Sequence, residues 1–174
     1  MLRGLRENGP IVLVPLAWTF ALAAHVGAIT LRTVLIAHLV MATVIVVFTA
    51  LSWREMTTGV LRAWKLVLLA GLAVTLLGTA GLLVTPPLRP LLTATVVGWM
   101  LVPAAGLIYT GRHVDALASV YTVGAAFGVV GAVVYTAGVA IGATSGVGLG
   151  LVAAGLGLTG VGQTAGIVAA VTQY

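Results

Sequence analysis

Long apolar runs alternate with short polar breaks along the whole chain. Six runs of about 20 residues carry few charges, and charged residues or Pro/Gly clusters separate them. A membrane-spanning helix needs about 20 apolar residues at a rise of 1.5 Å each. The pattern predicts an all-α, polytopic integral membrane protein, a six-transmembrane-helix bundle that forms one domain over residues 1–174. The predicted helices lie near residues 11–30, 32–52, 65–85, 91–110, 115–138 and 147–171.

The breaks between the runs indicate how the helices connect. Only residues 30–32 separate the first two runs, so these helices are expected to form a tight antiparallel hairpin. The segment 85–90 contains three prolines and cannot continue a helix, because proline lacks the backbone donor. The first run follows Arg3 and Arg6 as in a signal peptide, but it extends through Ile29, which is long for a signal core. It is therefore interpreted as an uncleaved first helix.

Composition supports lipid as the main solvent of the chain. Of 174 residues, 61% are hydrophobic and 6% are charged, and the mean hydropathy is +1.22. Soluble domains carry roughly a quarter charged residues. The net charge of +5 comes from single basic residues scattered between apolar runs, which does not indicate nucleic-acid binding. The chain has no cysteine, so disulfides and thiolate metal sites are excluded.

The basic residues predict the orientation in the membrane. Six lie at the N-terminus and in the second and fourth loops, and two lie on the opposite side. By the positive-inside rule, we expect a multi-pass protein of the cell membrane with both termini in the cytoplasm. The six are Arg3, Arg6, Arg54, Arg62, Lys65 and Arg112, and the two are Arg32 and Arg89.

Glycine is concentrated in the last two predicted helices. Small residues allow helix backbones to approach closely in lipid, where close packing replaces the hydrophobic drive. Packing within the chain is favoured over a face for a homo-oligomer or a larger membrane complex. The residues concerned are Gly124, Gly128, Gly131, Gly148, Gly150, Gly155, Gly157, Gly160, Gly162 and Gly166.

Candidate chemistry is confined to two histidines near the predicted outer face. The three carboxylates, Glu7, Glu55 and Asp115, fall at the predicted cytoplasmic edge, which argues against a proton pump or a carboxylate-based cation transporter. His25 lies six residues before Leu31 and His38 lies seven after it. In a tight hairpin, both imidazoles are expected about 10 Å below the outer turn.

Two methionines are expected at the same level as these histidines. Met41 follows His38 by three residues, on the same helix face, and Met100 lies about ten residues into its helix. We call His25, His38, Met41 and Met100 the histidine layer. Histidine with methionine is a ligand set for haem b iron or copper, and Arg32 and Arg89 are expected to pair with haem propionates.

Three interpretations of function remain open from the sequence. The preferred one is a haem b or copper protein of electron transfer or respiratory-complex assembly, loosely similar to small haem-binding membrane proteins but without a shared motif. The second is a small transporter or channel for an apolar or neutral solute. The third is a structural membrane subunit without a cofactor, whose histidines only bond to backbone or hydroxyl groups. No nucleotide loop, catalytic triad or zinc-protease motif is present, so no catalytic residue is assigned and a non-enzymatic role is favoured.

Overall fold

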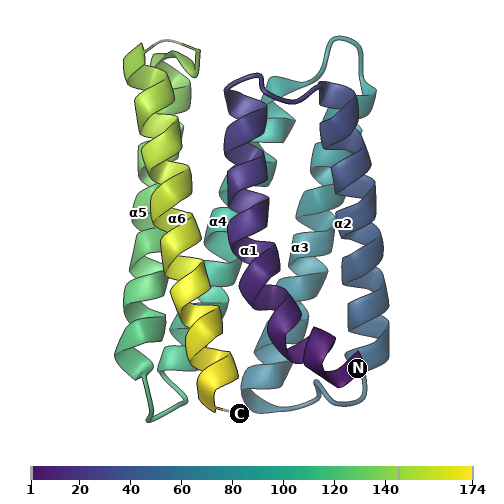
Figure 1. Ribbon diagram of the computed structural model, residues 1–174, viewed down its shortest axis with the longest axis vertical. Coiled ribbons are helices and arrows are strands. Elements are labelled where there is room, and N and C mark those ends of the chain that lie inside the picture. The colour runs from purple at the N-terminus through teal and green to yellow at the C-terminus, as the bar shows by residue number, and fades with distance from the viewer. Residues whose placement is uncertain (1, 145, 174) are drawn as a thin grey trace.

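The protein is a bundle of six α-helices, in agreement with the fold expected from the sequence. The computed structural model describes the backbone of residues 2–144 and 146–173 and the side chains of residues 11–144 and 146–172. Within these residues there is no strand, and the helices run alternately up and down (Figure 1). The helices are α1 (Leu2–His25), α2 (Leu31–Ser52), α3 (Gly59–Leu83), α4 (Arg89–Gly111), α5 (Ala118–Gly142) and α6 (Gly146–Gln173).

The helices have the length and composition of membrane spans. Five of them, α2 to α6, are long and apolar enough to cross a bilayer, and the described apolar part of α1, Ile11–His25, is shorter. Many large apolar side chains on these helices point outward; Val133, for example, is 66% exposed. Such surface is costly in water and favourable in lipid. The chain is therefore a multi-pass helical membrane protein.

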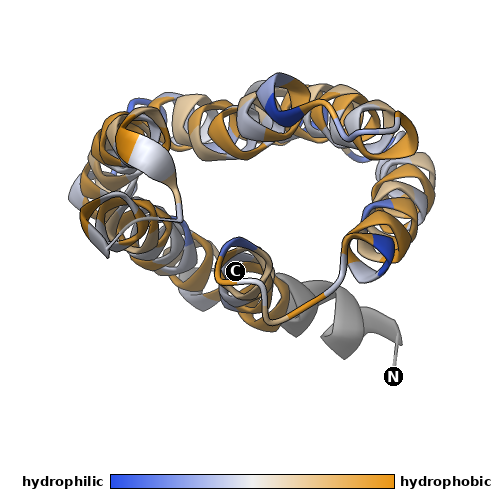
Figure 2. Ribbon diagram, turned by 90° about the horizontal axis from the view of Figure 1, so that it is seen from above, coloured by the Kyte–Doolittle hydropathy of each residue, from blue (hydrophilic) through white to orange (hydrophobic). Residues whose placement is uncertain are grey.

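The helices pack in the order α1, α6, α5, α4, α3, α2. Seen end-on, they form a ring in which α1 and α2 stand next to one another (Figure 2). Within the described residues, however, α1 and α2 are not among the helix pairs in substantial contact. The expected tight hairpin of the first two helices is therefore wrong: α1 packs on α6 and α2 packs on α3.

The first helix ends five residues earlier than expected. Gly27 has a φ of +73°, and the N–H groups of Gly27 and Ala28 donate to the carbonyls of Ala24 and Ala23 at 3.2 and 2.9 Å. These are the two hydrogen bonds of a Schellman motif, which stops a helix at a glycine. Residues 26–30 thus form the turn, and Thr30 caps α2 by accepting a bond from the N–H of Thr33.

Helix α1 begins at Leu2, well before its predicted start near residue 11. The boundaries of the other helices lie within a few residues of the predicted ones, except at the start of α3. This helix begins at Gly59 rather than near residue 65, because the polar residues Arg62 and Lys65 form its first turns. A prediction based on runs of apolar residues misses a helix end that carries polar residues at the membrane edge.

Close contact between α5 and α6 is made through glycines. A Cβ on Gly124 would lie 2.5 Å from Gly162 O, and one on Gly155 would lie 2.6 Å from Gly131 O. A third contact joins Gly138 to Gly148. The contact glycines recur every seventh residue on each helix, so the two backbones touch along their length. The expected packing role is confirmed for these positions.

Two other glycines of α6 do not take part in helix packing. A Cβ on Gly150 or Gly157 would meet no atom within 4 Å, and both residues are exposed. A packing role for every glycine of α6 is therefore wrong, because the two lie on the helix face that points away from α5.

Candidate functional site

His25 is the last residue of α1 and is anchored at both ring nitrogens. Its Nδ1 lies 2.8 Å from the carbonyl oxygen of Ala21, so Nδ1–H donates there. In the neutral ring, Nε2 then accepts, and the hydroxyl of Tyr135 on α5 donates to it at 3.0 Å. The two rings also meet edge to face, with centroids 5.5 Å apart.

Met100 and Thr93 meet Tyr135 from the same side of α4. The tyrosine is 1% exposed and packs in one apolar cluster with Met100, Ala132 and Leu156. The side chain of Thr93 also hydrogen-bonds to the phenol. Thr93 and Met100 are seven residues apart, which places both on the face of α4 that meets α5.

His38 lies on the other side of α4, against α3. Its Nδ1–H donates to the carbonyl of Val34 at 2.9 Å, which leaves a lone pair on Nε2. A Cβ on Gly78 would lie 2.8 Å from this Nε2 and 2.8 Å from the Thr95 hydroxyl oxygen. Among the described residues, no hydrogen bond to Nε2 is present.

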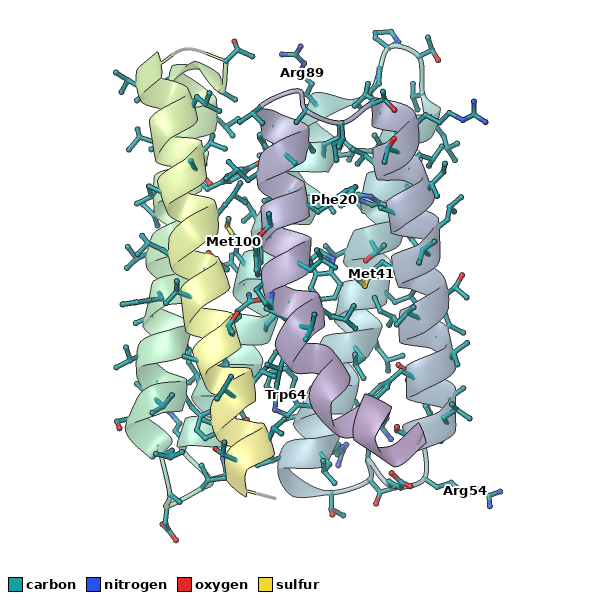
Figure 3. All side chains as sticks on the ribbon, viewed as in Figure 1. Phe20, Met41, Arg54, Trp64, Arg89 and Met100 are labelled. Carbon is teal, nitrogen blue, oxygen red and sulfur yellow. The ribbon has the colours of Figure 1, made fainter. Side chains whose placement is uncertain are left out.

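The helix α4 therefore divides the histidine layer into two groups. One group joins His25 to Tyr135 and the apolar cluster that contains Met100. The other places His38 against Gly78 and Thr95, with half-buried Met41 on the next turn of α2. Figure 3 shows the two methionines on opposite sides of α1, with Met41 toward α2 and Met100 toward α6.

The two histidines do not occupy equivalent positions along their helices. His25 closes α1, whereas His38 lies seven residues after Leu31, about 10 Å into α2. The equal depth expected from the sequence required α1 to continue to residue 30. Because residues 26–30 form a turn instead, equal depth of the two histidines is no longer expected.

The predicted partners of haem propionates lie at the end of the bundle. Arg32 in the first turn of α2 and Arg89 at the start of α4 are both exposed. Figure 3 shows Arg89 above the helices, on the opposite end from Arg54. The two arginines are thus on the same end of the molecule as the loops 26–30 and 84–88.

A third histidine serves as an internal comparison. His113 also donates its Nδ1–H to the carbonyl four residues earlier, that of Tyr109, at 2.8 Å. It is exposed and stacks on the Tyr109 ring with centroids 4.0 Å apart. The bond from Nδ1 alone therefore does not mark a ligand site; what distinguishes His38 is the position of Nε2 between α2, α3 and α4.

A hydrogen-bonded chain that the sequence analysis missed crosses the middle of the bundle. Trp18 of α1 donates to Gln163 of α6 at 3.1 Å, and the amide of Gln163 donates to the carbonyl of Trp99 on α4 at 2.9 Å. The indole of Trp99 donates to Thr75 of α3 at 3.1 Å. Gln163 is 5% exposed. Gln163 is not ionisable, so a search for ionisable residues does not find it. The sequence nevertheless shows it as a neutral amide in the middle of an apolar run.

A groove of about 750 Å³ lies between α1 and α6, away from the histidines. Its walls include Trp18, Leu22, Gly157 and Val161, and no charged residue lines it. Neither His25 nor His38 belongs to its lining. Any apolar molecule held there would not contact the histidine layer.

The chain matches no protein-family model, and no curated protein or solved structure is similar to it at a significant level. Its function must therefore be inferred from its own residues.

Proposed function

We propose that this membrane protein binds haem b or copper through the histidine layer and acts in electron transfer or in the assembly of a respiratory complex. The observation that carries the proposal is the Nε2 atom of His38. It bears a lone pair inside a membrane bundle and has no hydrogen-bond partner among the described residues. Membrane interior offers no water to satisfy such a group, and leaving it unpaired costs free energy.

The orientation of both imidazoles supports ligation. Each donates Nδ1–H to a carbonyl of its own helix, at 2.8 Å for His25 and 2.9 Å for His38. Ligating histidines commonly fix their ring in this way, because the bond sets the tautomer that presents Nε2. In this geometry Nε2 of His38 is available as a ligand, whereas Nε2 of His25 must first lose its hydrogen bond from the Tyr135 hydroxyl.

The loose contact between α1 and α2 supports room for a ligand on the His38 side. A cofactor between two packed helices must push them apart, since packed axes are only 8–10 Å distant. Here α1 and α2 are joined by residues 26–30 and pack on different partners within the described part of the chain. A group held on the α1 side of α2 would therefore break few existing contacts, whereas Nε2 of His38 itself faces Gly78 of α3.

An absorption spectrum and a metal analysis test the proposal. The full chain is purified in detergent from cells supplied with haem and copper. We expect a Soret band or bound copper in the wild type and its loss in His38→Ala, with helix content unchanged by circular dichroism. His113→Ala is the matched control and should keep the cofactor, because His113 makes the same Nδ1 bond at the other end of the bundle. A colourless, metal-free wild type would overturn the proposal.

A further inference from the structure

A twelve-residue segment that begins at Trp64 in α3 is repeated from Trp99 in α4. The two segments, WKLVLLAGLAVT and WMLVPAAGLIYT, carry the same residue at seven of twelve positions, namely Trp, Leu, Val, Ala, Gly, Leu and Thr. The copies bind one another. The indole of Trp64 donates to the hydroxyl of Thr110 on α4 at 3.0 Å. The indole of Trp99 donates to the hydroxyl of Thr75 on α3 at 3.1 Å, so two equivalent bonds join the helices.

The repeat shows what a proline changes in α4. Pro103 lies inside α4 at the position that Leu68 occupies in α3. Proline has no N–H, so residue 103 cannot give the usual helical hydrogen bond to the carbonyl of Trp99, four residues earlier. The N–H of Leu68 provides this donor in α3. The hydrogen bonding of α4 is therefore interrupted between a first half, residues 89–99, and a second half, residues 103–111.

Gln163 of α6 supplies the missing donor. Its amide nitrogen donates to the carbonyl oxygen of Trp99 at 2.9 Å, and this is the carbonyl that Pro103 leaves without a helical partner. Its amide oxygen accepts from the indole of Trp18 at 3.1 Å, and an indole N–H can only donate, so the orientation of the amide is fixed. A carbonyl away from water requires such a substitute donor.

The first half of α4 lies between the two groups of the histidine layer. The side chain of Thr93 hydrogen-bonds to Tyr135, the partner of His25. Thr95 donates to the carbonyl of Val74 on α3 at 3.2 Å, on the side of His38. Helices bend at internal prolines because the lost bond no longer holds the two halves in line. A bend at residues 99–103 would therefore move the segment that separates the histidines.

We infer that α4 is a hinged helix, and that the hydrogen bond from Gln163 to the Trp99 carbonyl is the latch that holds its two halves in line. With the latch bonded, the Trp99 carbonyl is satisfied and α4 is fixed to α6 beside the hinge. With the latch open, the first half can bend away from the second. The hinge goes beyond the proposed function and requires no cofactor, so it is tested on the cofactor-free protein.

Distances between pairs of spin labels, measured by pulsed EPR, test the hinge. The labels are attached to cysteines introduced into the full-length, cysteine-free chain at four exposed positions. Ala94→Cys with Val147→Cys joins the first half of α4 to the start of α6. Ala105→Cys with Val168→Cys joins the second half of α4 to the last turns of α6. In Gln163→Met, the distance distribution of the first pair should broaden and that of the second pair should not.

Pro103→Ala is the rescue variant. It returns a backbone N–H to the Trp99 carbonyl, so in the Gln163→Met background it should restore the wild-type distribution of the first pair. Pro15→Ala is the matched control, because it removes a proline from α1 and leaves the Trp99 carbonyl unchanged; it should not restore the distribution. Broadening that is absent, equal in both pairs, or not reversed by Pro103→Ala would overturn the latch.

A double-mutant cycle measures the same coupling through stability. The shift of the SDS unfolding midpoint caused by Gln163→Met should be about half as large in the Pro103→Ala background, where only the bond from Trp18 is lost. If Gln163→Met does not fold, Gln163→Asn, whose amide is one methylene shorter, takes its place in both experiments. Equal shifts in the two backgrounds would overturn the latch. Coupling in a protein that binds neither haem nor copper would support the hinge while overturning the proposed function.

Discussion

Gln163 ties three helices together through side-chain hydrogen bonds. Its carbonyl oxygen accepts from Trp18 and its amide nitrogen donates to the backbone of Trp99, so one side chain of α6 joins α1 and α4. Trp99 extends the chain to Thr75 of α3. These bonds form where the alternative is an unpaired polar group away from water. We therefore assign Gln163 a structural role at the centre of the bundle.

Gln163→Met should destabilise the protein by about 1–2 kcal/mol. Methionine keeps the volume but leaves the Trp18 indole N–H and the Trp99 carbonyl without their partner. Unfolding by SDS titration in mixed micelles measures the free energy. Thr172→Val on the same helix is the control and should change little, because Thr172 is exposed and bonds only within α6. Unchanged stability in Gln163→Met would contradict the structural role of the hydrogen bonds that Gln163 makes.

Single residues of the candidate site were only partly predictable. His25, His38 and Met41 could be named because ionisable and sulfur-containing side chains are conspicuous in apolar runs. The residues that meet His38, namely Gly78 and Thr95, could not, since contacts among α2, α3 and α4 depend on helix rotation. A helix that is apolar on all sides carries little information about which face turns inward.

The presence and approximate position of the six helices were predicted more successfully than the residues at which they begin and end. The run lengths and polar breaks give six helices because the bilayer thickness sets a minimum length for each. The end of α1 was missed although Gly27 stands two residues after His25. Apolar residues 28 and 29 continue the hydropathy signal beyond the point where the backbone reverses, so hydropathy alone overestimates the helix.

Two glycines of α6 that lie two residues apart, on opposite faces of the helix, should respond oppositely to alanine. Gly155→Ala should destabilise by about 1–3 kcal/mol, because its Cβ would lie 2.6 Å from Gly131 O and Tyr135 N and force α5 and α6 apart. Gly157→Ala should be neutral or stabilise by up to about 1 kcal/mol, because alanine favours the helix and its Cβ meets nothing. Thermal unfolding in detergent compares the pair. A loss of stability in Gly157→Ala equal to that in Gly155→Ala would contradict the assigned α5–α6 interface.

At the scale of the whole molecule, neighbours in sequence are not always neighbours in packing. The ring order places α1 beside α6, so the first and last helices close the bundle, while α1 and α2 are joined by a loop and make no substantial contact within the described residues (Figure 2). Sequence indicated a hairpin because adjacent helices with short connections usually pack together. The contact of Gly160 with Trp18 and the Trp18–Gln163 hydrogen bond instead fix α1 to α6.

The orientation of the bundle in its membrane can be tested directly because the chain contains no cysteine. The two ends of the bundle differ in charge: Arg54, Arg62, Lys65 and Arg112 lie at one end, and Arg32 and Arg89 at the other. From the positive-inside rule we expect the loops 26–30 and 84–88 outside and both chain ends in the cytoplasm. Single cysteines can be introduced at exposed loop positions: Ala28 and Thr85 for the predicted outer end, and Thr57 for the inner one.

A membrane-impermeant thiol reagent applied to intact cells should label Ala28→Cys and Thr85→Cys at once. It should label Thr57→Cys only after the membrane is permeabilised. The expectation follows because α2 and α3 must each cross the bilayer between these positions, and both are long and apolar enough to do so. A reversed pattern would mean that the charge difference does not set the orientation. Labelling of Ala28→Cys and Thr57→Cys from the same side would mean that α2 does not cross the membrane.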